Sequence, residues 1–302
     1  MYIRDLLASI VRSLPAGVRG RGFVAKRIHR FFGPGGSAKQ AVRMVRLKSG
    51  DRMEIDLRSR TEWPVYYLGE YDPAQIDWVR RVIARGWTVL DVGANVGFWT
   101  VPLAAHVRRL AAGRVIAFEP IPKNYERLLI NLGHNNLQDW TVPLCMALGE
   151  TEGSANMGMD SVSPTGDAVI LSGGVKAWDN MRHTQVPVRP LDAVYQENGF
   201  GACDFMKVDV EGYEIPFLRG AVSTIRRYRP IILGEFNTDY MRDFGFSFGE
   251  VEQILAGLEY KWYVWTKAGW GDWTGTKKPT QDILLVPSNR AVDLACGRAR
   301  QP

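Results

Sequence analysis

From residue 88 onward, short apolar runs alternate with segments whose apolar residues recur at helical spacing. Apolar runs of this length predict strands that are buried on both faces of a sheet, and the segments between them predict helices that cover it. The last two runs have no helical segment between them and predict an antiparallel pair. The chain therefore predicts an α/β fold with a mostly parallel, seven-stranded sheet. The predicted strands are residues 88–93, 114–120, 140–149, 203–210, 230–236, 261–266 and 282–287, and the predicted helices are residues 98–110, 123–136, 214–228 and 247–260.

The part of the chain before this alternation has a different pattern. Residues 1–36 predict one or two short basic helices that end at the breaker Gly-Pro-Gly-Gly of residues 33–36. Residues 41–57 alternate around a Ser-Gly-Asp turn and predict a β-hairpin. Residues 72–85 predict a helix with Pro73 at its first position. We expect three parts: a basic arm with the hairpin (1–60), a main domain (61–290) and a tail (291–302).

One polar, Gly- and Ser-rich segment, residues 150–185, interrupts the alternation. A loop of this length in a compact domain is usually a lid or a binding element. Residues 186–195 predict a short strand that follows it. We therefore interpret residues 150–185 as a lid or insert beside the functional site.

Charge separates the arm from the rest of the chain. Residues 1–50 contain eleven Lys or Arg and one acid, Asp5, whereas the other 252 residues carry 27 basic and 31 acidic side chains. Three interpretations of the arm stay open: a solvated appendage or oligomer contact, attachment to an anionic membrane surface, and a nucleic-acid contact. For the membrane interpretation, one helical face would carry Leu6, Leu7, Ile10, Val11 and Leu14. The nucleic-acid interpretation is the weakest, because the positive charge does not extend into the main domain.

The composition bears on the location of the protein and on the role of its cysteines. No apolar stretch is long enough to span a membrane, and the N-terminus lacks the apolar region of a signal peptide, so a cytoplasmic location is expected. The three cysteines are scattered without a CxxC pair, which disfavours a zinc ribbon and a disulfide framework.

The turn after the first parallel strand carries the motif Asp-Val-Gly-Ala-Asn-Val-Gly, residues 91–97. Glycines there let the backbone approach a ligand, and Glu119, at the end of the next strand, can accept hydrogen bonds from both hydroxyls of a ribose. Dinucleotide sites use GxGxxG to seat a pyrophosphate, whereas this turn has GxxxG after an acid. Asp91 would repel a pyrophosphate but suits the cationic methionine part of S-adenosylmethionine.

The same segments resemble the FkbM-type methyltransferases. The resemblance covers roughly residues 62–286 and is carried by residues 89–104, 115–136, 206–221 and 229–236, above all by the combination of DVGAN with KVDVEGYE and LRGA. It implies a Rossmann-like class I methyltransferase fold, S-adenosylmethionine as the cofactor and transfer to oxygen. The cofactor-binding residues expected from the motif and the resemblance are Glu70, Asp91, Gly93, Ala94, Asn95, Gly97, Phe98, Glu119, Pro120, Ala147 and Asp209.

Methyl transfer to a hydroxyl requires a base that removes its proton. Carboxylates at the ends of the fourth and fifth parallel strands are the candidates, namely Asp209, Glu211 and Glu235. His183, at the end of the expected lid, is the one histidine considered as a base. The three carboxylates would also suit magnesium, but no contiguous acidic ligand motif is present, so no metal site is favoured.

Together these features predict an S-adenosylmethionine-dependent O-methyltransferase. The acceptor would be a hydroxyl of a sugar, glycolipid or natural product, in secondary metabolism or glycan modification. A nucleic-acid methyltransferase is an alternative, but the main domain is mildly acidic and lacks the (D/N)PP(Y/F) tetrapeptide. A non-enzymatic cofactor-binding protein is the other. A small-molecule or glycoside acceptor is expected, nucleic acid is not favoured, and a membrane contact of the arm and a homo-oligomer stay open.

Overall fold

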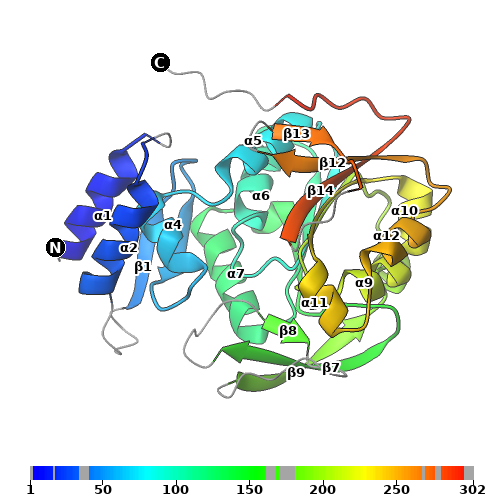
Figure 1. Cartoon of the computed structure of the whole chain (residues 1–302), viewed down its shortest axis with the longest axis horizontal. Coiled ribbons are helices and arrows are strands. Elements are labelled where there is room, and N and C mark those ends of the chain that lie inside the picture. Colours follow the sequence, from blue (N-terminus) through cyan, green and yellow to red (C-terminus); the bar gives the residue numbers. More distant parts are fainter. Residues whose placement is uncertain are drawn as a thin grey trace.

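The computed structural model describes residues 3–15, 18–33, 41–160, 168–170, 181–266, 269–275 and 280–295. Its centre is an eight-stranded sheet in the order β13-β12-β14-β11-β10-β3-β4-β5 (Figure 1). The five strands from β11 to β5 are parallel, and β14, β12 and β13 are added antiparallel. The expected α/β fold with a mostly parallel sheet is confirmed. The strands are β3 (Thr88–Val92), β4 (Arg114–Phe118), β5 (Thr141–Leu144), β10 (Phe205–Val208), β11 (Ile231–Asn237), β12 (Tyr260–Thr266), β13 (Gly269–Asp272) and β14 (Thr280–Pro287).

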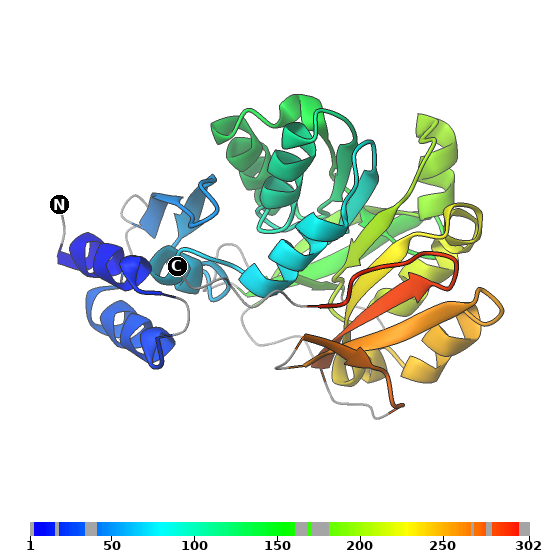
Figure 2. The same ribbon diagram turned by 90° about the horizontal axis from the view of Figure 1, so that it is seen from above.

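Helices cover both faces of this sheet (Figure 2). Side chains of one strand alternate between the two faces, so that Leu90 packs on one side and Val89 on the other. On the first side lie α8 (Leu191–Asn198), α9 (Glu214–Gly220), α10 (Val222–Tyr228), α11 (Thr238–Asp243) and α12 (Phe248–Ile254). On the second lie α5 (Pro73–Val82), α6 (Thr100–Arg109) and α7 (Pro122–His134), and the short 3-10 helix η1 (Gln138–Trp140) leads into β5.

A second, smaller sheet differs from the expectation. The third run does not form one strand, because β5 ends at Leu144 and β6 (Ala147–Leu148) pairs with β9 (Met181–Arg189) instead. β9 also pairs antiparallel with β7 (Gly153–Asp160), which in turn pairs with β8 (Ala168–Ile170). The segment expected as a loop is therefore partly strand, although residues 161–167 and 171–180 lie outside the described residues. The strand expected at 186–195 ends at Arg189, and α8 begins after Pro190.

Two further elements were not expected. The link between the last two predicted strands was expected to be a loop, but it contains β13, which pairs with β12. α11 follows β11 directly, and Asn237 caps it by accepting hydrogen bonds from the backbone N–H groups of Asp239 and Tyr240. The next helix, α12, begins with a capping box formed by Ser247 and Glu250.

The N-terminal arm forms a separate layer at one end of the molecule (Figures 1 and 2). It contains α1 (Ile3–Ser13), α2 (Arg21–Phe32) and the hairpin of β1 (Val42–Arg46) and β2 (Arg52–Asp56), as the sequence predicts; residues 34–40 are outside the described part. α4 (Glu62–Leu68) packs into the same apolar cluster, so this cluster continues past residue 60.

Buried polar contacts fasten the arm to the main domain. Arg127 of α7 makes a two-pronged ion pair with Glu62 of α4, with N···O distances of 2.5 and 2.8 Å. Glu62 also accepts from the backbone N–H of Asp56, and Arg127 donates to the backbone oxygen of Glu54. Because both charges are buried, removing either side chain would leave the other as an unpaired charge in the interior and destabilise the fold.

No helix in the described part of the chain has the length and apolar character needed to cross a bilayer.

Candidate functional site

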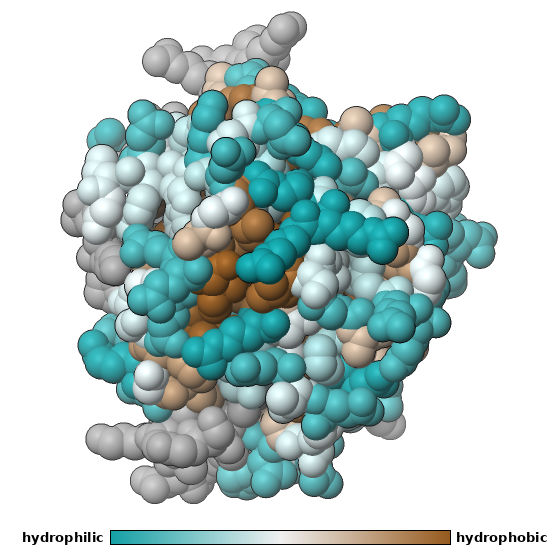
Figure 3. Space-filling view, turned by 90° about the vertical axis from the view of Figure 1, so that its right-hand side faces the viewer, coloured by the Kyte–Doolittle hydropathy of each residue, from teal (hydrophilic) through white to brown (hydrophobic). Residues whose placement is uncertain are grey.

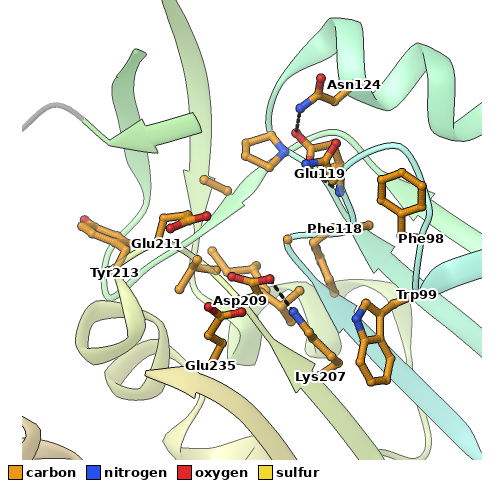
Figure 4. Close-up of a pocket in the computed structure, with 18 of the residues that line it drawn as sticks. Phe98, Trp99, Phe118, Glu119, Asn124, Lys207, Asp209, Glu211, Tyr213 and Glu235 are labelled. Atoms are coloured by element: carbon orange, nitrogen blue, oxygen red, sulfur yellow. Dashed lines mark hydrogen bonds and ion pairs between the residues drawn. The ribbon is translucent and has the colours of Figure 1, made fainter. Parts of the chain in front are cut away.

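A cavity of about 370 Å³ lies at the carboxyl ends of β3, β4, β10 and β11 (Figure 4). These strands are parallel neighbours in the sheet, so the residues that follow them meet at one edge. In open α/β sheets this edge is where ligands bind. The cavity has two parts, which we call the β3–β4 half (Gly93, Asn95 and Glu119) and the β10–β11 half (Lys207, Asp209 and Glu235).

The turn after β3 approaches the strand beside it closely. Gly93 has φ of +86°, and a Cβ built on it would lie 1.9 Å from the backbone oxygen of Asp209. Only glycine fits both the dihedral angle and this contact. Asn95, also at positive φ, points its backbone N–H toward Glu119. The turn thus forms a backbone cradle at the cavity wall.

Glu119 lies at the end of β4 with both carboxylate oxygens held by the backbone. Oε2 accepts from the N–H of Asn95 at 2.8 Å, and Oε1 accepts from the N–H of Ile121 at 2.9 Å. Burial raises the pKa of Glu119 to about 7, while these hydrogen bonds favour its charged form. A carboxylate has about four lone-pair positions. These two bonds and a longer one of 3.4 Å from the Asn124 side chain to Oε1 use three of them, so about one position, on Oε2, is left for a hydroxyl group of a ligand.

Asn124 of α7 adds an unpartnered atom to this half. Its side-chain N–H donates to Glu119 at 3.4 Å, whereas its Oδ1 is buried without a hydrogen-bond partner among the described residues (Figure 4). Asn124 lines the cavity. A buried acceptor beside a cavity is a position for a donor group of a ligand.

Asp91 and Gly97 stand behind the turn and do not line the cavity. Asp91 is buried, its Oδ2 accepts from the hydroxyl of Thr100 at 2.5 Å, and its burial raises its pKa to about 6. A Cβ on Gly97 would lie 2.9 Å from the Leu128 side chain. The structure therefore places both residues where they shape the turn from inside the core.

The β10–β11 half contains a buried cation among carboxylates. Lys207 donates to Asp209 at 2.6 Å and lies 5.7 Å from the centre of the Trp99 ring. Asp209, Asp91 and Glu235 together raise the pKa of Lys207 despite its burial. Figure 4 shows the carboxylates of Asp209 and Glu235 side by side above Lys207. Burial and the neighbouring Asp209 raise the pKa of Glu235 to about 7.

The structure brings most of the expected site residues to this one cavity. Glu211 lines it on a turn in which Glu211 and Gly212 both have positive φ. The expected residues that line the cavity are Gly93, Ala94, Asn95, Phe98, Glu119, Pro120, Ala147, Asp209, Glu211 and Glu235.

Two expected residues lie elsewhere. Glu70 forms ion pairs with Arg21 and Lys48, at 2.9 and 3.3 Å, and joins the arm to the segment after α4. His183 is exposed on β9 and is not among the residues that line the cavity. Neither side chain can contact a ligand in the cavity without moving.

Several lining residues were missed in the sequence. Lys207 precedes Asp209 by two positions, so both side chains point to the same side of the strand end, and a lysine inside an apolar run was the available signal. Asn237 stands in the same relation to Glu235. Neither Tyr71, which stacks on Phe98 with ring centres 4.6 Å apart, nor Met157 of β7 was among the residues expected at the site.

Within the described residues, no three His, Cys, Asp or Glu side chains lie close enough together to hold a metal ion. Asp209, which was considered as a magnesium ligand, pairs with Lys207 instead.

The family match covers the residues that define both halves of the cavity. The model described as the methyltransferase FkbM domain matches residues 91–262, which is more than half of the chain. The match includes Glu119, Lys207, Asp209 and Glu235. No match was found among curated proteins.

Solved structures with a similar fold include several methyltransferases. A methyltransferase FkbM from Methylobacillus flagellatus KT has 18% identity and a TM-score of 0.44, and the alignment covers 67% of this chain and 44% of that one. An O-methyltransferase from Bacillus cereus in complex with SAH has 15% identity and a TM-score of 0.41, with coverage of 72% and 82%. A precorrin-6y C5,15-methyltransferase from Geobacter metallireducens GS-15 has 12% identity and a TM-score of 0.39, with coverage of 72% and 88%.

This chain spans less than half of the Methylobacillus protein. Likeness at these TM-scores says nothing about the substrate. The match of the family model over residues 91–262 carries the assignment, and the chain belongs to the FkbM-domain methyltransferases.

Proposed function

We propose that the chain is an S-adenosylmethionine-dependent O-methyltransferase whose acceptor is a hydroxyl of a sugar, glycolipid or natural product. The observation that supports this cofactor is the position of Glu119, whose carboxylate lines the cavity. It accepts two backbone N–H bonds and a longer bond from Asn124, and it has about one acceptor position left for a ribose hydroxyl. The Gly93 cradle beside it lets a ligand approach the backbone. The buried, unpartnered Oδ1 of Asn124 offers an acceptor for an amino group of the adenine.

The β10–β11 half then serves the acceptor. S-adenosylmethionine supplies an electrophilic methyl group on a sulfonium, and a neutral hydroxyl is a poor nucleophile for it. Glu235 removes the hydroxyl proton, because a base with a pKa of about 7 is suited to proton transfer at neutral pH. The acceptor oxygen bonds to the methyl carbon as the carbon–sulfur bond breaks, and the electron pair of that bond stays on sulfur.

Asp209 is a weaker candidate for this base. Its carboxylate already accepts a hydrogen bond from Lys207 at 2.6 Å, so one of its oxygens is engaged before an acceptor hydroxyl arrives. Asp209 therefore positions Lys207 and keeps the pKa of Glu235 raised through repulsion between the two carboxylates.

The lining of the cavity disfavours nucleic acid as the acceptor. Glu119, Asp209, Glu211 and Glu235 line it against one cation, Lys207, within the described residues. A polyanionic phosphate backbone requires the opposite balance.

Titration calorimetry with S-adenosylhomocysteine tests the cofactor, and release of that product in the presence of a glycoside panel tests the reaction. We expect micromolar binding and turnover of at least one glycoside. Failure to bind would refute the proposed cofactor. Binding without turnover of any glycoside would favour a non-enzymatic cofactor-binding protein over the proposed enzyme.

The substitution Glu235→Gln tests whether the two halves of the cavity have separate roles in catalysis and in cofactor binding. We expect kcat to fall by about 10²- to 10⁴-fold, the range for loss of a general base, while the affinity for S-adenosylhomocysteine stays nearly unchanged. The matched control is Glu252→Gln, which removes an exposed carboxylate of α12. If Glu235→Gln keeps the kcat of the control, another group is the base.

A further inference from the structure

The arm exposes an unusual number of large apolar side chains. Of the eleven that are exposed among the described residues, eight lie between Ile3 and Phe32. On α1 they recur at helical spacing, and on α2 Phe23 and Phe31 are 65% and 69% exposed. Exposed apolar residues that gather in one place usually mark an interaction site. We call this set the arm face, and it consists of Ile3, Leu6, Ile10, Phe23, Val24 and Phe31.

These exposed side chains are not the ones that hold the arm together. α1 packs inward through Ala8 and Val11, and α2 packs inward through Ala25. The sequence placed Val11 on the apolar face for a membrane, but the structure uses it in the core. The arm face is therefore a second apolar surface, left over after the arm has packed.

Positive charge accompanies the arm face. Arg27 of α2 lies near two of its phenylalanines, 5.8 Å from the centre of the Phe23 ring and 5.7 Å from that of Phe31. Lys26 and Arg30 are exposed on the same helix, and neither they nor Arg27 form an ion pair within the described residues. The single acid of the first 50 residues, Asp5, accepts a hydrogen bond from the Tyr66 hydroxyl.

The position of the arm leaves this surface accessible. α1 and α2 form the end of the molecule farthest from β12 and α10 (Figures 1 and 2). The opposite end has a different surface, because its apolar area lies in a hollow surrounded by hydrophilic side chains (Figure 3). The two ends differ in whether apolar side chains project into solvent.

We propose that the arm face binds the surface of a membrane that contains anionic lipids. Helices with exposed phenylalanine, leucine and isoleucine beside lysine and arginine bury the apolar groups at the headgroup boundary and place the cations among phosphates. A nucleic acid would use the cations but would leave Ile3, Leu6 and Ile10 exposed. A second copy of the chain would bring the same positive charge to the contact.

The contacts of the arm fix how the rest of the molecule sits at the membrane. Arg21 bonds to Glu70 and to the backbone oxygen of Leu68, and His29 stacks on Trp63 with ring centres 4.5 Å apart. Tyr71, which follows Glu70, lines the cavity. Binding through the arm face would therefore hold the main domain, and with it the cavity, close to the lipid surface.

Cosedimentation of the full chain with vesicles tests the proposal. We expect binding to equimolar phosphatidylcholine and phosphatidylglycerol, weaker binding as salt increases, and little binding to phosphatidylcholine alone. The double substitution Phe23→Ser/Phe31→Ser should weaken binding at least about tenfold, because two buried aromatic side chains are lost. Arg27→Gln/Arg30→Gln should weaken it by about tenfold or more, since each cation near an anionic surface contributes.

Matched controls remove the same kinds of side chain from other parts of the surface. Leu129→Ser/Ile130→Ser takes two exposed apolar side chains from α7, and Arg226→Gln/Arg227→Gln takes two exposed cations from α10. Both controls should bind the anionic vesicles like the unaltered chain. All four variants should keep their thermal midpoint and their affinity for S-adenosylhomocysteine in solution, which separates this proposal from the proposed function.

Three results would overturn the proposal. The first is no binding to anionic vesicles. The second is binding that the arm variants and the controls weaken equally. The third is a dimer in sedimentation velocity that only the arm variants dissociate, which would assign the arm face to a second copy of the chain.

Discussion

The two halves of the cavity hold their carboxylates in different ways. In the β3–β4 half, backbone N–H groups of neighbouring turns hold Glu119. In the β10–β11 half, the ammonium group of the buried Lys207 holds Asp209, and Glu235 lies beside them. Most substitutions leave a backbone N–H in place, whereas replacing one lysine removes the donor of the other half. The first arrangement suits recognition of a ligand, and the second suits a reaction in which a proton moves.

The largest effect is expected from removing the cation of the β10–β11 half. Lys207→Met leaves Asp209 and Glu235 without their buried partner, and breaking a buried ion pair in this way costs about 3–5 kcal/mol of unfolding free energy. Urea unfolding at pH 8 measures it. The control Lys261→Met removes an exposed lysine of β12 and should change stability by less than about 0.5 kcal/mol. If Lys207→Met costs no more than the control, the acids are not held by this cation.

The next largest effect concerns the contact between the halves. Gly93→Ala combines a positive φ with a Cβ that would lie 1.9 Å from the Asp209 oxygen, whereas Gly86→Ala has a similar φ of +89° and open space around it. We expect Gly86→Ala to cost about 1–2 kcal/mol and Gly93→Ala to cost about 1–3 kcal/mol more, as overpacking does. Thermal unfolding compares them.

Calorimetry compares the same two glycine variants in their binding of S-adenosylhomocysteine. Only Gly93→Ala should weaken the binding of S-adenosylhomocysteine, because only that turn lines the cavity. Equal effects of the two alanines on stability and on binding would contradict the close contact.

The smallest effect is a pH dependence in the β3–β4 half. In the proposed complex the carboxylate form of Glu119 accepts a ribose hydroxyl, so affinity for S-adenosylhomocysteine should fall as pH decreases below about 7. The fall approaches tenfold per pH unit, and Glu119→Gln should bind weakly at every pH. Glu126→Gln, an exposed carboxylate of α7, is the control. A wild-type affinity that is the same at pH 5.5 and pH 8 would argue against this role.

Stability should change with pH in the opposite direction. The pKa of Glu119 is raised on folding, so the folded state binds its proton more tightly than the unfolded state does. This contribution is complete below a pH of about 4.5, the usual value for a glutamate, and is lost as pH rises through about 7. Acid therefore stabilises the free protein through Glu119 while it weakens ligand binding.

The sequence predicted the β3–β4 half better than the rest of the site. Apolar runs ended by Gly or an acid are local signals, and they located Gly93, Asn95 and Glu119 at one sheet edge. The pattern did not show that Asp91 faces the core, because side-chain direction at a strand end depends on what packs behind it. The hydroxyl of Thr100, nine residues later, donates a hydrogen bond to Asp91 there.

Contacts distant in sequence explain the other differences. Glu70 was expected at the cofactor, but Arg21, 49 residues earlier, binds its carboxylate. β6 leaves the main sheet because β9 pairs with it, about 40 residues later. Periodicity describes neighbours along the chain, so it identifies elements and cannot tell which distant partner each one takes. The cavity residues Lys207 and Asn237 were visible only as polar positions near strand ends.

The ion pair between Glu62 and Arg127 has a consequence for the newly made chain. These residues are 65 positions apart, and the arm leaves the ribosome first. At about 5–20 residues per second, several seconds pass before Arg127 has been synthesised. During that interval Glu62 has no partner from α7, and the apolar side of α4 has not yet met the main domain. The arm therefore cannot complete this contact with the main domain until α7 has been synthesised, so this part of its attachment forms late in translation.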